Sequence, residues 1–162
     1  MSLKNKVWIE QVRDELKSDF ETEILYYDHW DKGVEEMDFP AEEVKLKKMC
    51  QGEYVILSKS AGSWLALKLV AEGKVKPRKL ILVGPAWSWA KNNGFDPSEL
   101  IRKVDIPILI VDKTADPAIS FADLKREVDG LNKPNLRLVE VPGDTHHYED
   151  VIGLGKIVRE FV

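Results

Sequence analysis

The chain has 162 residues, 44% hydrophobic and 32% charged, and this length and composition predict one folded domain over residues 1–162. Its net charge is −4, from 24 lysines and arginines against 28 aspartates and glutamates, so the basic surface of a nucleic-acid-binding protein is lacking and we expect no nucleic-acid partner. The absence of a long apolar run and of a signal-peptide core predicts a cytoplasmic protein without a membrane partner, and the single cysteine, Cys50, excludes an internal disulfide.

Helix and strand patterns alternate in the first half of the chain. Trp8, Ile9, Val12 and Leu16 recur at helical spacing, and a short apolar run follows them. Asp38 is a suitable N-cap, and Pro40 would fall in the first turn of the helix that Asp38 opens, where proline is tolerated. We expect a helix over 5–19, a strand over 23–27, a polar stretch over 28–37, a helix over 39–51, a strand over 54–57 and a helix over 61–72.

The second half repeats this alternation. Ser120 and Asp123 resemble a capping box in front of a further helix. We expect a strand over 79–83, a loop over 84–95, a short helix opened by Asp96 and Pro97, a strand over 107–111, a strand over 136–141 and a final helix from 151 to 161. Strands that alternate with helices predict an α/β protein with three α/β/α layers and a mainly parallel sheet of about five strands.

Ser60 lies where the strand over 54–57 meets the following helix. The local sequence is Ser58-Lys59-Ser60-Ala61-Gly62, and its small residues allow the strand and the helix to approach closely. A serine in this setting is typical of a nucleophile elbow, with the backbone N–H of Ala61 directed at a developing oxyanion. Ser58 stands where glycine is usual. A serine-rich helix cap is the alternative interpretation.

Asp116 lies in the loop after the strand over 107–111. Ligands of parallel α/β sheets bind at the carboxyl ends of the strands, so an acid at this place could orient a catalytic histidine. Asp112 and Asp116 are also residue types that are common in turns and caps, and this ordinary interpretation stays open.

Two of the three histidines, His146 and His147, follow the strand over 136–141. Either could act as a general base toward a serine nucleophile. The alternatives are a surface histidine pair or weak metal binding together with Asp144, Glu149 or Asp150. No HExxH or Cys/His spacing supports the metal alternative, and we expect no metal.

The order Ser60, Asp116, His146 is the chain order of the triad in α/β-hydrolases and differs from the orders in chymotrypsin and subtilisin. With these motifs, most of the chain resembles a small, lidless α/β-hydrolase of the bacterial serine-hydrolase kind. Residues 141–146, Val-Pro-Gly-Asp-Thr-His, are similar to the terminal Gly-x-x-His segment of that family, which favours His146 over His147.

The resemblance implies a mechanism without a metal or an organic cofactor. Ser60 would attack a small-molecule acyl substrate, an ester, thioester or amide, with His146 as base and Asp116 holding the imidazole. The residues that could line the substrate pocket are His29, Trp30, Lys59 and Trp87. Their alternative roles are packing or, for Lys59, exposure to solvent.

The resemblance also implies a part that we do not find. In the family, a central strand and a His-Gly loop precede the first helix, and this loop supplies the second oxyanion N–H. The helix over 5–19 begins almost at the first residue, so we expect the N-terminal strands to be lacking. The strands over 23–27 and 54–57 could then pair directly, or a homodimer could fill the gap. Alternatively, Met1 to Leu3 could be an expression remnant before a truncated fold.

Two functions compete on this basis. The first is a serine hydrolase that works through an acyl-enzyme. The second is a non-catalytic α/β-hydrolase-fold protein that binds a ligand or a partner, which an incomplete oxyanion hole would favour, because one missing donor costs about 10²–10³ in rate. An unrelated flavodoxin-like domain is disfavoured because no Gly-rich phosphate loop follows a first strand.

Overall fold

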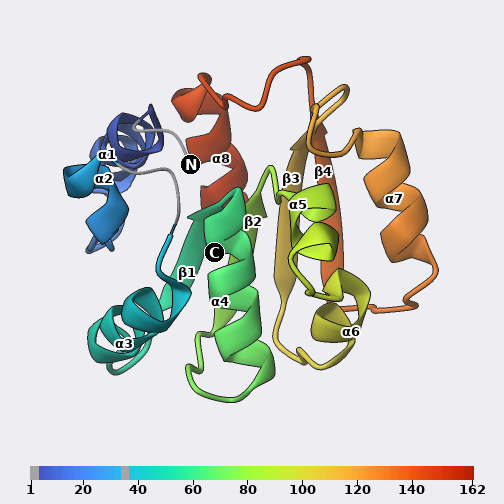
Figure 1. Ribbon diagram of the computed structural model, residues 1–162. Coiled ribbons are helices and arrows are strands. Elements are labelled where there is room, and N and C mark those ends of the chain that lie inside the picture. The colour runs from blue at the N-terminus through green and yellow to red at the C-terminus, as the bar shows by residue number, and fades with distance from the viewer. Residues whose placement is uncertain (1–3, 34–36) are drawn as a thin grey trace. The chain divides into compact units, whose positions relative to one another are not determined.

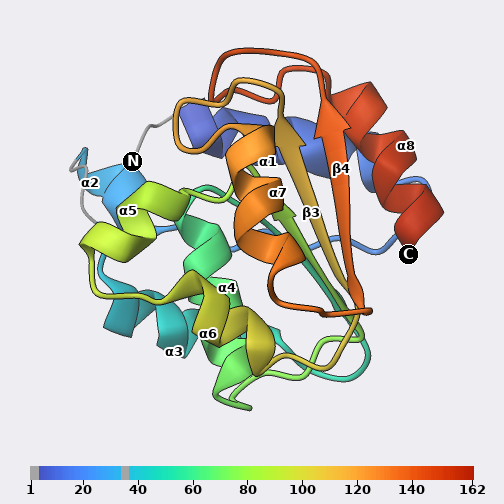
Figure 2. The ribbon, with the colours of Figure 1, turned by 90° about the vertical axis from the view of Figure 1, so that its right-hand side faces the viewer.

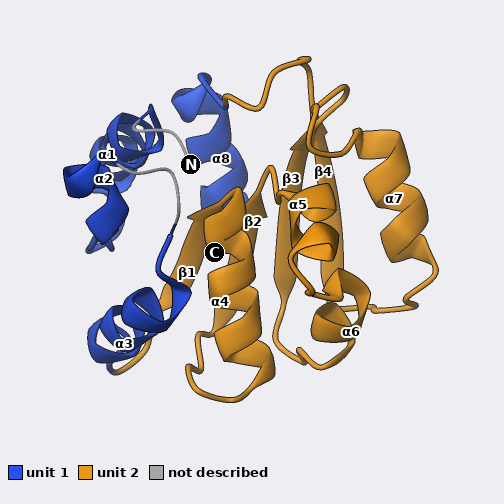
Figure 3. Ribbon diagram, viewed as in Figure 1, with its two compact units in different colours: residues 1–51, 148–162 blue, residues 52–147 orange. Residues whose placement is uncertain are grey.

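The computed structural model describes residues 4–33 and 37–162 (Figure 1). The chain divides into two compact units (Figure 3). Unit 1 comprises Met1–Gln51 and Tyr148–Val162, and unit 2 comprises Gly52–His147. The single domain over 1–162 stays a prediction.

Unit 2 contains a parallel four-stranded sheet flanked by helices (Figure 1). The strands are β1 (Val55–Lys59), β2 (Lys79–Val83), β3 (Ile108–Lys113) and β4 (Leu136–Val141), in the order β1-β2-β3-β4. In register, Lys59 lies opposite Val83, and Val83 lies opposite Val111. The carboxyl ends of all four strands therefore meet at one edge of the sheet, which is where the candidate site residues follow β1, β3 and β4. The predicted α/β class is confirmed, with four strands rather than five.

The central strands β2 and β3 form the core of the sheet. Leu80 to Val83 and Ile108 to Val111 are almost completely shielded from solvent. This is the reason why their sequences are continuous apolar runs without alternation, as is typical of a parallel sheet. The outer strand β4 instead leaves Arg137 and Glu140 exposed.

Four helices of unit 2 lie on one face of the sheet in both views (Figures 1 and 2). They are α4 (Ala61–Ala71), α5 (Trp87–Asn92), α6 (Pro97–Arg102) and α7 (Phe121–Asp129). Helix α4 contacts β1 and β2, and its Trp64 indole N–H donates to the carbonyl of Ala86 at 2.9 Å. As predicted, Ser120 caps α7 by accepting a hydrogen bond from the Asp123 N–H at 3.2 Å.

Unit 1 contains α1 (Lys4–Leu16), α2 (Asp28–Lys32), α3 (Phe39–Met49) and α8 (Val151–Phe161). Helix α1 packs against α8, and the indole N–H of Trp8 donates to the carbonyl of Tyr148 at 2.8 Å. Arg159 of α8 donates to Glu15 at 3.0 Å and to Asp19 at 2.9 Å. The predicted Asp38 cap of α3 accepts from the Ala41 N–H at 3.1 Å.

The strand expected over 23–27 is wrong, because residues 21–27 have no regular secondary structure. Direct pairing of this segment with β1 as a fifth strand is therefore wrong as well. The backbone here bonds to side chains of α3 instead of a strand: the carbonyl of Tyr26 accepts from Lys45, and the N–H of Asp28 donates to Glu42. Aromatic and β-branched residues favour a strand only where a neighbouring strand offers a ladder.

Two short helices lie in segments whose sequences did not predict helix. Helix α2 occupies the start of the polar stretch over 28–37, of which residues 34–36 lie outside the described residues. Helix α5 lies within the loop expected over 84–95. Among the helices of the described residues, none combines the length and apolar composition that crossing a membrane requires.

Candidate active site

Ser60 occupies the turn between β1 and α4, with φ 56° and ψ −129°. A positive φ is uncommon for any residue other than glycine. Two backbone hydrogen bonds fix this conformation: the Ser60 N–H donates to the carbonyl of Val83 at 3.1 Å, and the Ser60 carbonyl accepts from the Ser63 N–H at 3.1 Å. The Ser60 side chain makes no capping hydrogen bond to α4, which argues against the helix-cap interpretation.

The residues beside Ser60 suit a tight strand-to-helix turn. Ser58 is buried, and its hydroxyl donates to the carbonyl of Ile81 at 3.2 Å, so the polar group that replaces the usual glycine is satisfied. Ala61 is the first residue of the eleven-residue helix α4. The first N–H groups of a helix have no acceptor within the helix and carry its positive partial charge, so the Ala61 N–H suits a developing anion.

The structure brings Ser60, Asp116 and His146 together, although they are far apart in the sequence. The Oγ of Ser60 lies 2.9 Å from Nε2 of His146, and Nδ1 of His146 lies 2.9 Å from both carboxylate oxygens of Asp116. Ser60 is 8% exposed and Asp116 3% exposed, whereas the His146 side chain is 27% exposed. Both partners of the imidazole are thus buried, while the imidazole between them borders solvent.

The chemistry of the three groups fixes the direction of their hydrogen bonds. An ionised carboxylate only accepts, so Nδ1 of His146 carries the proton that is donated to Asp116. Nε2 then has a free lone pair, which accepts the hydroxyl proton of Ser60. Asp116 also accepts from the Ala118 N–H at 2.8 Å, which holds its carboxylate in place. A serine hydroxyl that donates to an imidazole oriented in this way is poised for deprotonation.

The loops that carry Asp116 and His146 are bonded to each other. The Thr114 N–H donates to the carbonyl of Val141 at 2.9 Å, and the Ala115 N–H donates to the carbonyl of Gly143 at 2.9 Å. These bonds extend the β3–β4 ladder beyond the strand ends. They place the acid and the imidazole at the same edge of the sheet.

Lys113 is a residue of this region that the sequence pattern does not distinguish. It is the last residue of β3, it is only 7% exposed, and its amine donates to the loop that carries His146. The chain has 24 lysines and arginines, and most such residues are exposed. The one available signal is its position at the end of a buried apolar strand.

The four residues predicted to line a substrate pocket fall in both units. His29 and Trp30 are buried on α2 of unit 1, where burial lowers the pKa of the His29 imidazole. In unit 2, Lys59 ends β1 and is buried, contrary to the solvent-exposed alternative. Trp87 begins α5 and packs edge-to-face on Trp64, with ring centroids 5.5 Å apart. Their role in substrate binding stays a prediction.

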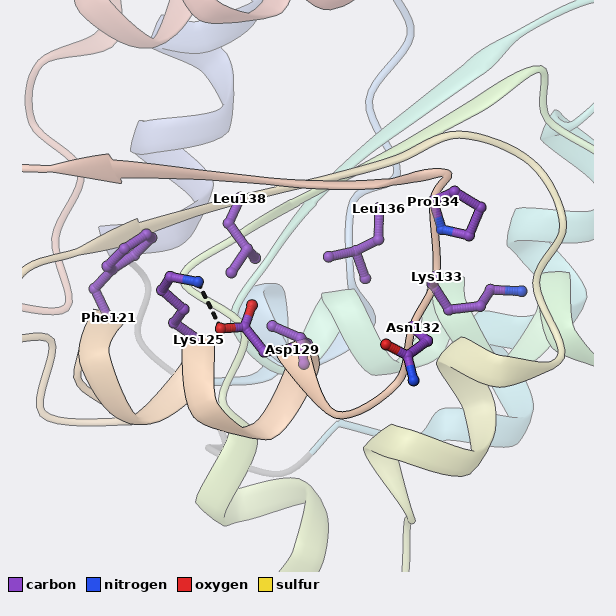
Figure 4. A pocket seen from close by; sticks show the side chains of 9 residues that line it. Phe121, Lys125, Asp129, Asn132, Lys133, Pro134, Leu136 and Leu138 are labelled. Atoms are coloured by element: carbon purple, nitrogen blue, oxygen red, sulfur yellow. Dashed lines mark hydrogen bonds and ion pairs between the residues drawn. The ribbon is translucent and has the colours of Figure 1, made fainter.

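A surface cavity of about 720 Å³ lies elsewhere in unit 2, between α7 and β4 (Figure 4). Its walls combine apolar side chains, such as Leu136 and Leu138, with an ion pair of 2.5 Å between Lys125 and Asp129. None of the predicted site residues lines this cavity.

The metal alternative for the histidine loop lacks a set of ligands. Within residues 4–33 and 37–162, no group of three or more histidine, cysteine, aspartate or glutamate side chains is placed to hold a metal ion.

No protein-family model matches this chain, and no curated protein matches its sequence. Solved structures match its fold. An uncharacterized protein from Bacillus cereus ATCC 10987 is 17% identical with a TM-score of 0.71, over 96% of this chain but only 55% of that chain. A protein assigned to the alpha/beta hydrolase superfamily from Xanthomonas campestris pv. campestris is 17% identical with a TM-score of 0.67, over 94% and 89% of the two chains. An alpha-beta serine hydrolase homologue from Coxiella burnetii is 22% identical with a TM-score of 0.61, over 80% and 62%.

These likenesses define the fold class. The chain has a small α/β-hydrolase-like fold, as its sequence resemblance implied. The similar structures include a hydrolase of E-2-(acetamidomethylene)succinate, an esterase domain and a monoacylglycerol lipase.

Proposed function

We propose that this protein is a serine hydrolase that cleaves a small ester, thioester or amide through an acyl-enzyme. The observation that carries the proposal is the continuous hydrogen-bonded chain from Ser60 through His146 to Asp116, with 2.9 Å at each step. A lipase, an esterase domain and a hydrolase among the structures of similar fold support the same reaction class.

The first half of the reaction forms the acyl-enzyme. Oγ of Ser60 attacks the acyl carbonyl carbon while its proton passes to Nε2 of His146. The imidazolium that results is stabilised by the adjacent Asp116 carboxylate, which stays ionised. The carbonyl oxygen becomes an oxyanion, to which we expect the Ala61 N–H at the start of α4 to donate. Collapse of this intermediate breaks the bond to the leaving group, which takes the proton from Nε2.

The second half releases the acid. A water molecule gives a proton to Nε2 of His146 as its oxygen attacks the acyl carbon. The second tetrahedral intermediate then expels Oγ of Ser60, which regains the proton from Nε2. The net reaction adds one water across the scissile bond and needs no further reactant.

A fluorophosphonate probe tests this proposal, because it phosphonylates a serine only where a neighbouring base activates the hydroxyl. We expect the wild-type protein to be labelled, and we expect Ser60→Ala to abolish labelling and the hydrolysis of short-chain p-nitrophenyl esters. Ser63→Ala is the matched control, since Ser63 is buried one turn further along α4 and should leave labelling intact. A well-folded wild-type protein that is neither labelled nor active on such esters would overturn the proposal in favour of a non-catalytic binding protein.

A further inference from the structure

We propose that Lys113 is a positioning residue that holds His146 in reach of Ser60, an inference that rests on the proposed function. His146 lies on a segment without helix or strand, so the regular hydrogen-bond ladders of the fold do not fix its backbone. Something else must hold the imidazole between its two partners. The buried amine of Lys113 meets this need.

The ammonium group bonds to both residues that flank His146. Nζ of Lys113 donates to Oγ1 of Thr145 at 3.0 Å and to the backbone carbonyl of His147. Thr145 in turn donates its hydroxyl to the same carbonyl at 3.3 Å. One lysine thus ties together the residue before and the residue after the imidazole, at the end of the rigid strand β3.

The backbone at Gly143 is shaped to admit this lysine. Gly143 has φ 142°, and a Cβ built on it would lie 2.7 Å from Cδ and 2.9 Å from Cε of Lys113. No larger residue fits there without displacing the lysine stem. The carbonyl of Gly143 also accepts from the Ala115 N–H, one residue before Asp116. Gly143 therefore both leaves room for the Lys113 stem and joins the histidine loop to the acid loop.

Charge makes this tether stronger than a neutral one. Hydrogen bonds from an ammonium group are roughly twice as strong as bonds between neutral groups, and a buried ammonium without acceptors is costly. Lys113 is 7% exposed, so it favours the loop arrangement in which its amine keeps the Thr145 and His147 acceptors. Because the amine bonds to the residues on either side of His146, its assigned role is to orient the imidazole base and not to contact the substrate.

The test compares Lys113→Met with wild type and with Lys103→Met. Methionine keeps a similar stem length and loses the amine, while Lys103 is an exposed lysine paired with Glu99 on α6. Displacing a catalytic group by about 1 Å costs on the order of 100-fold in rate. We expect Lys113→Met to lower kcat by about 10- to 100-fold with KM within about twofold of wild type, and Lys103→Met to change neither.

A second pair of variants covers the case in which Lys113→Met fails to fold. Thr145→Val removes one acceptor without changing the size of the side chain, and Thr145→Ser keeps the hydroxyl. We expect Thr145→Val to lower kcat several-fold and Thr145→Ser to restore it. A kcat for Lys113→Met or Thr145→Val equal to that of wild type would overturn the positioning role, as would an equal loss in Lys103→Met.

Proton NMR separates this inference from the proposed function. A histidine N–H bonded to a carboxylate gives a resonance at unusually low field, and it reports the contact between His146 and Asp116 without any substrate. We expect the resonance in wild type and in Lys103→Met, and its loss or broadening in Lys113→Met. If wild type is not labelled by the probe, the hydrolase proposal fails, and the NMR result alone decides the positioning role: an unchanged resonance in Lys113→Met overturns it.

Discussion

The backbone conformation of Ser60 should lower the stability of the protein, and the unfolding free energies of variants at this position can measure this cost. With φ 56° and ψ −129°, Ser60 occupies a conformation that glycine adopts readily and that a Cβ disfavours. We expect Ser60→Gly to be more stable than Ser60→Ala. Both variants lose the bond from Oγ to His146, so this loss cancels in the comparison.

The size of the difference follows from two opposing effects. A non-glycine residue in such a region stores about 1–3 kcal/mol of strain, which glycine releases. Glycine also makes the unfolded chain more flexible, which costs about 0.4–1 kcal/mol of stability. Subtracting the second effect from the first leaves the unfolding free energy of Ser60→Gly above that of Ser60→Ala by up to about 2.6 kcal/mol, with a middle value of about 1.3 kcal/mol, or about 3–5 °C in Tm for a chain of this length.

Thermal and urea denaturation followed by circular dichroism measure this difference. Ser63 in α4 provides the control, because glycine in a helix is about 1 kcal/mol less favourable than alanine. The order should thus be reversed at Ser63, with Ser63→Gly less stable than Ser63→Ala. If Ser60→Ala proves as stable as Ser60→Gly or more so, the strain at Ser60 does not exceed the flexibility cost of glycine, and the argument is refuted.

Two further predictions concern a partner of His146 and a buried histidine. Asp116→Asn puts an amide in place of an acceptor-only carboxylate, so Nδ1 of His146 can be left unprotonated, and Nε2 can then no longer accept the Ser60 proton. We expect kcat to fall by about 10³–10⁴-fold while the circular dichroism spectrum stays unchanged. A kcat within tenfold of that of wild type would contradict this prediction. Burial lowers the pKa of His29, so the unfolded chain binds this proton more readily than the folded protein does. The unfolding free energy should therefore fall as the pH drops below about 6.5, by at most about 1.4 kcal/mol per pH unit. His29→Phe should remove this loss in urea titrations between about pH 7 and 5.5. The same slope in the variant would show that another group is responsible.

The sequence predicts those elements best that carry both an apolar run and a local boundary signal. The bounds of β2 and β4 agree with the prediction, and Asp38 and Ser120 cap the helices that they were expected to open. In each case the deciding interaction lies within a few residues of the chain. Such signals do not depend on the partners that the tertiary structure brings together.

The segment over 23–27 shows the opposite case. Its aromatic and β-branched residues are typical of a strand. The backbone bonds instead to residues that are distant in the sequence: Lys45 donates to the carbonyl of Tyr26, and Glu42 accepts from the adjoining N–H of Asp28. Helices α2 and α5, with five and six residues, are too short to show the helical period that the sequence pattern relies on.

The candidate site divides in the same way between local and distant causes. The sequence predicts Ser60 because the strand, the tight turn and the helix around it are contiguous. It predicts Asp116 and His146 because each follows an apolar strand. The sequence does not predict the role of Lys113, because this role depends on contacts between distant residues. These are the pairing of β3 with β4, the positive φ at Gly143 and the bond to the carbonyl of His147, 34 residues away. Sequence patterns thus identify the groups that can react, whereas the contacts that hold them in a reactive arrangement arise only from the folded chain. Variants at Lys113 and Thr145 address this second kind of information, because they leave all three predicted reactive groups in place.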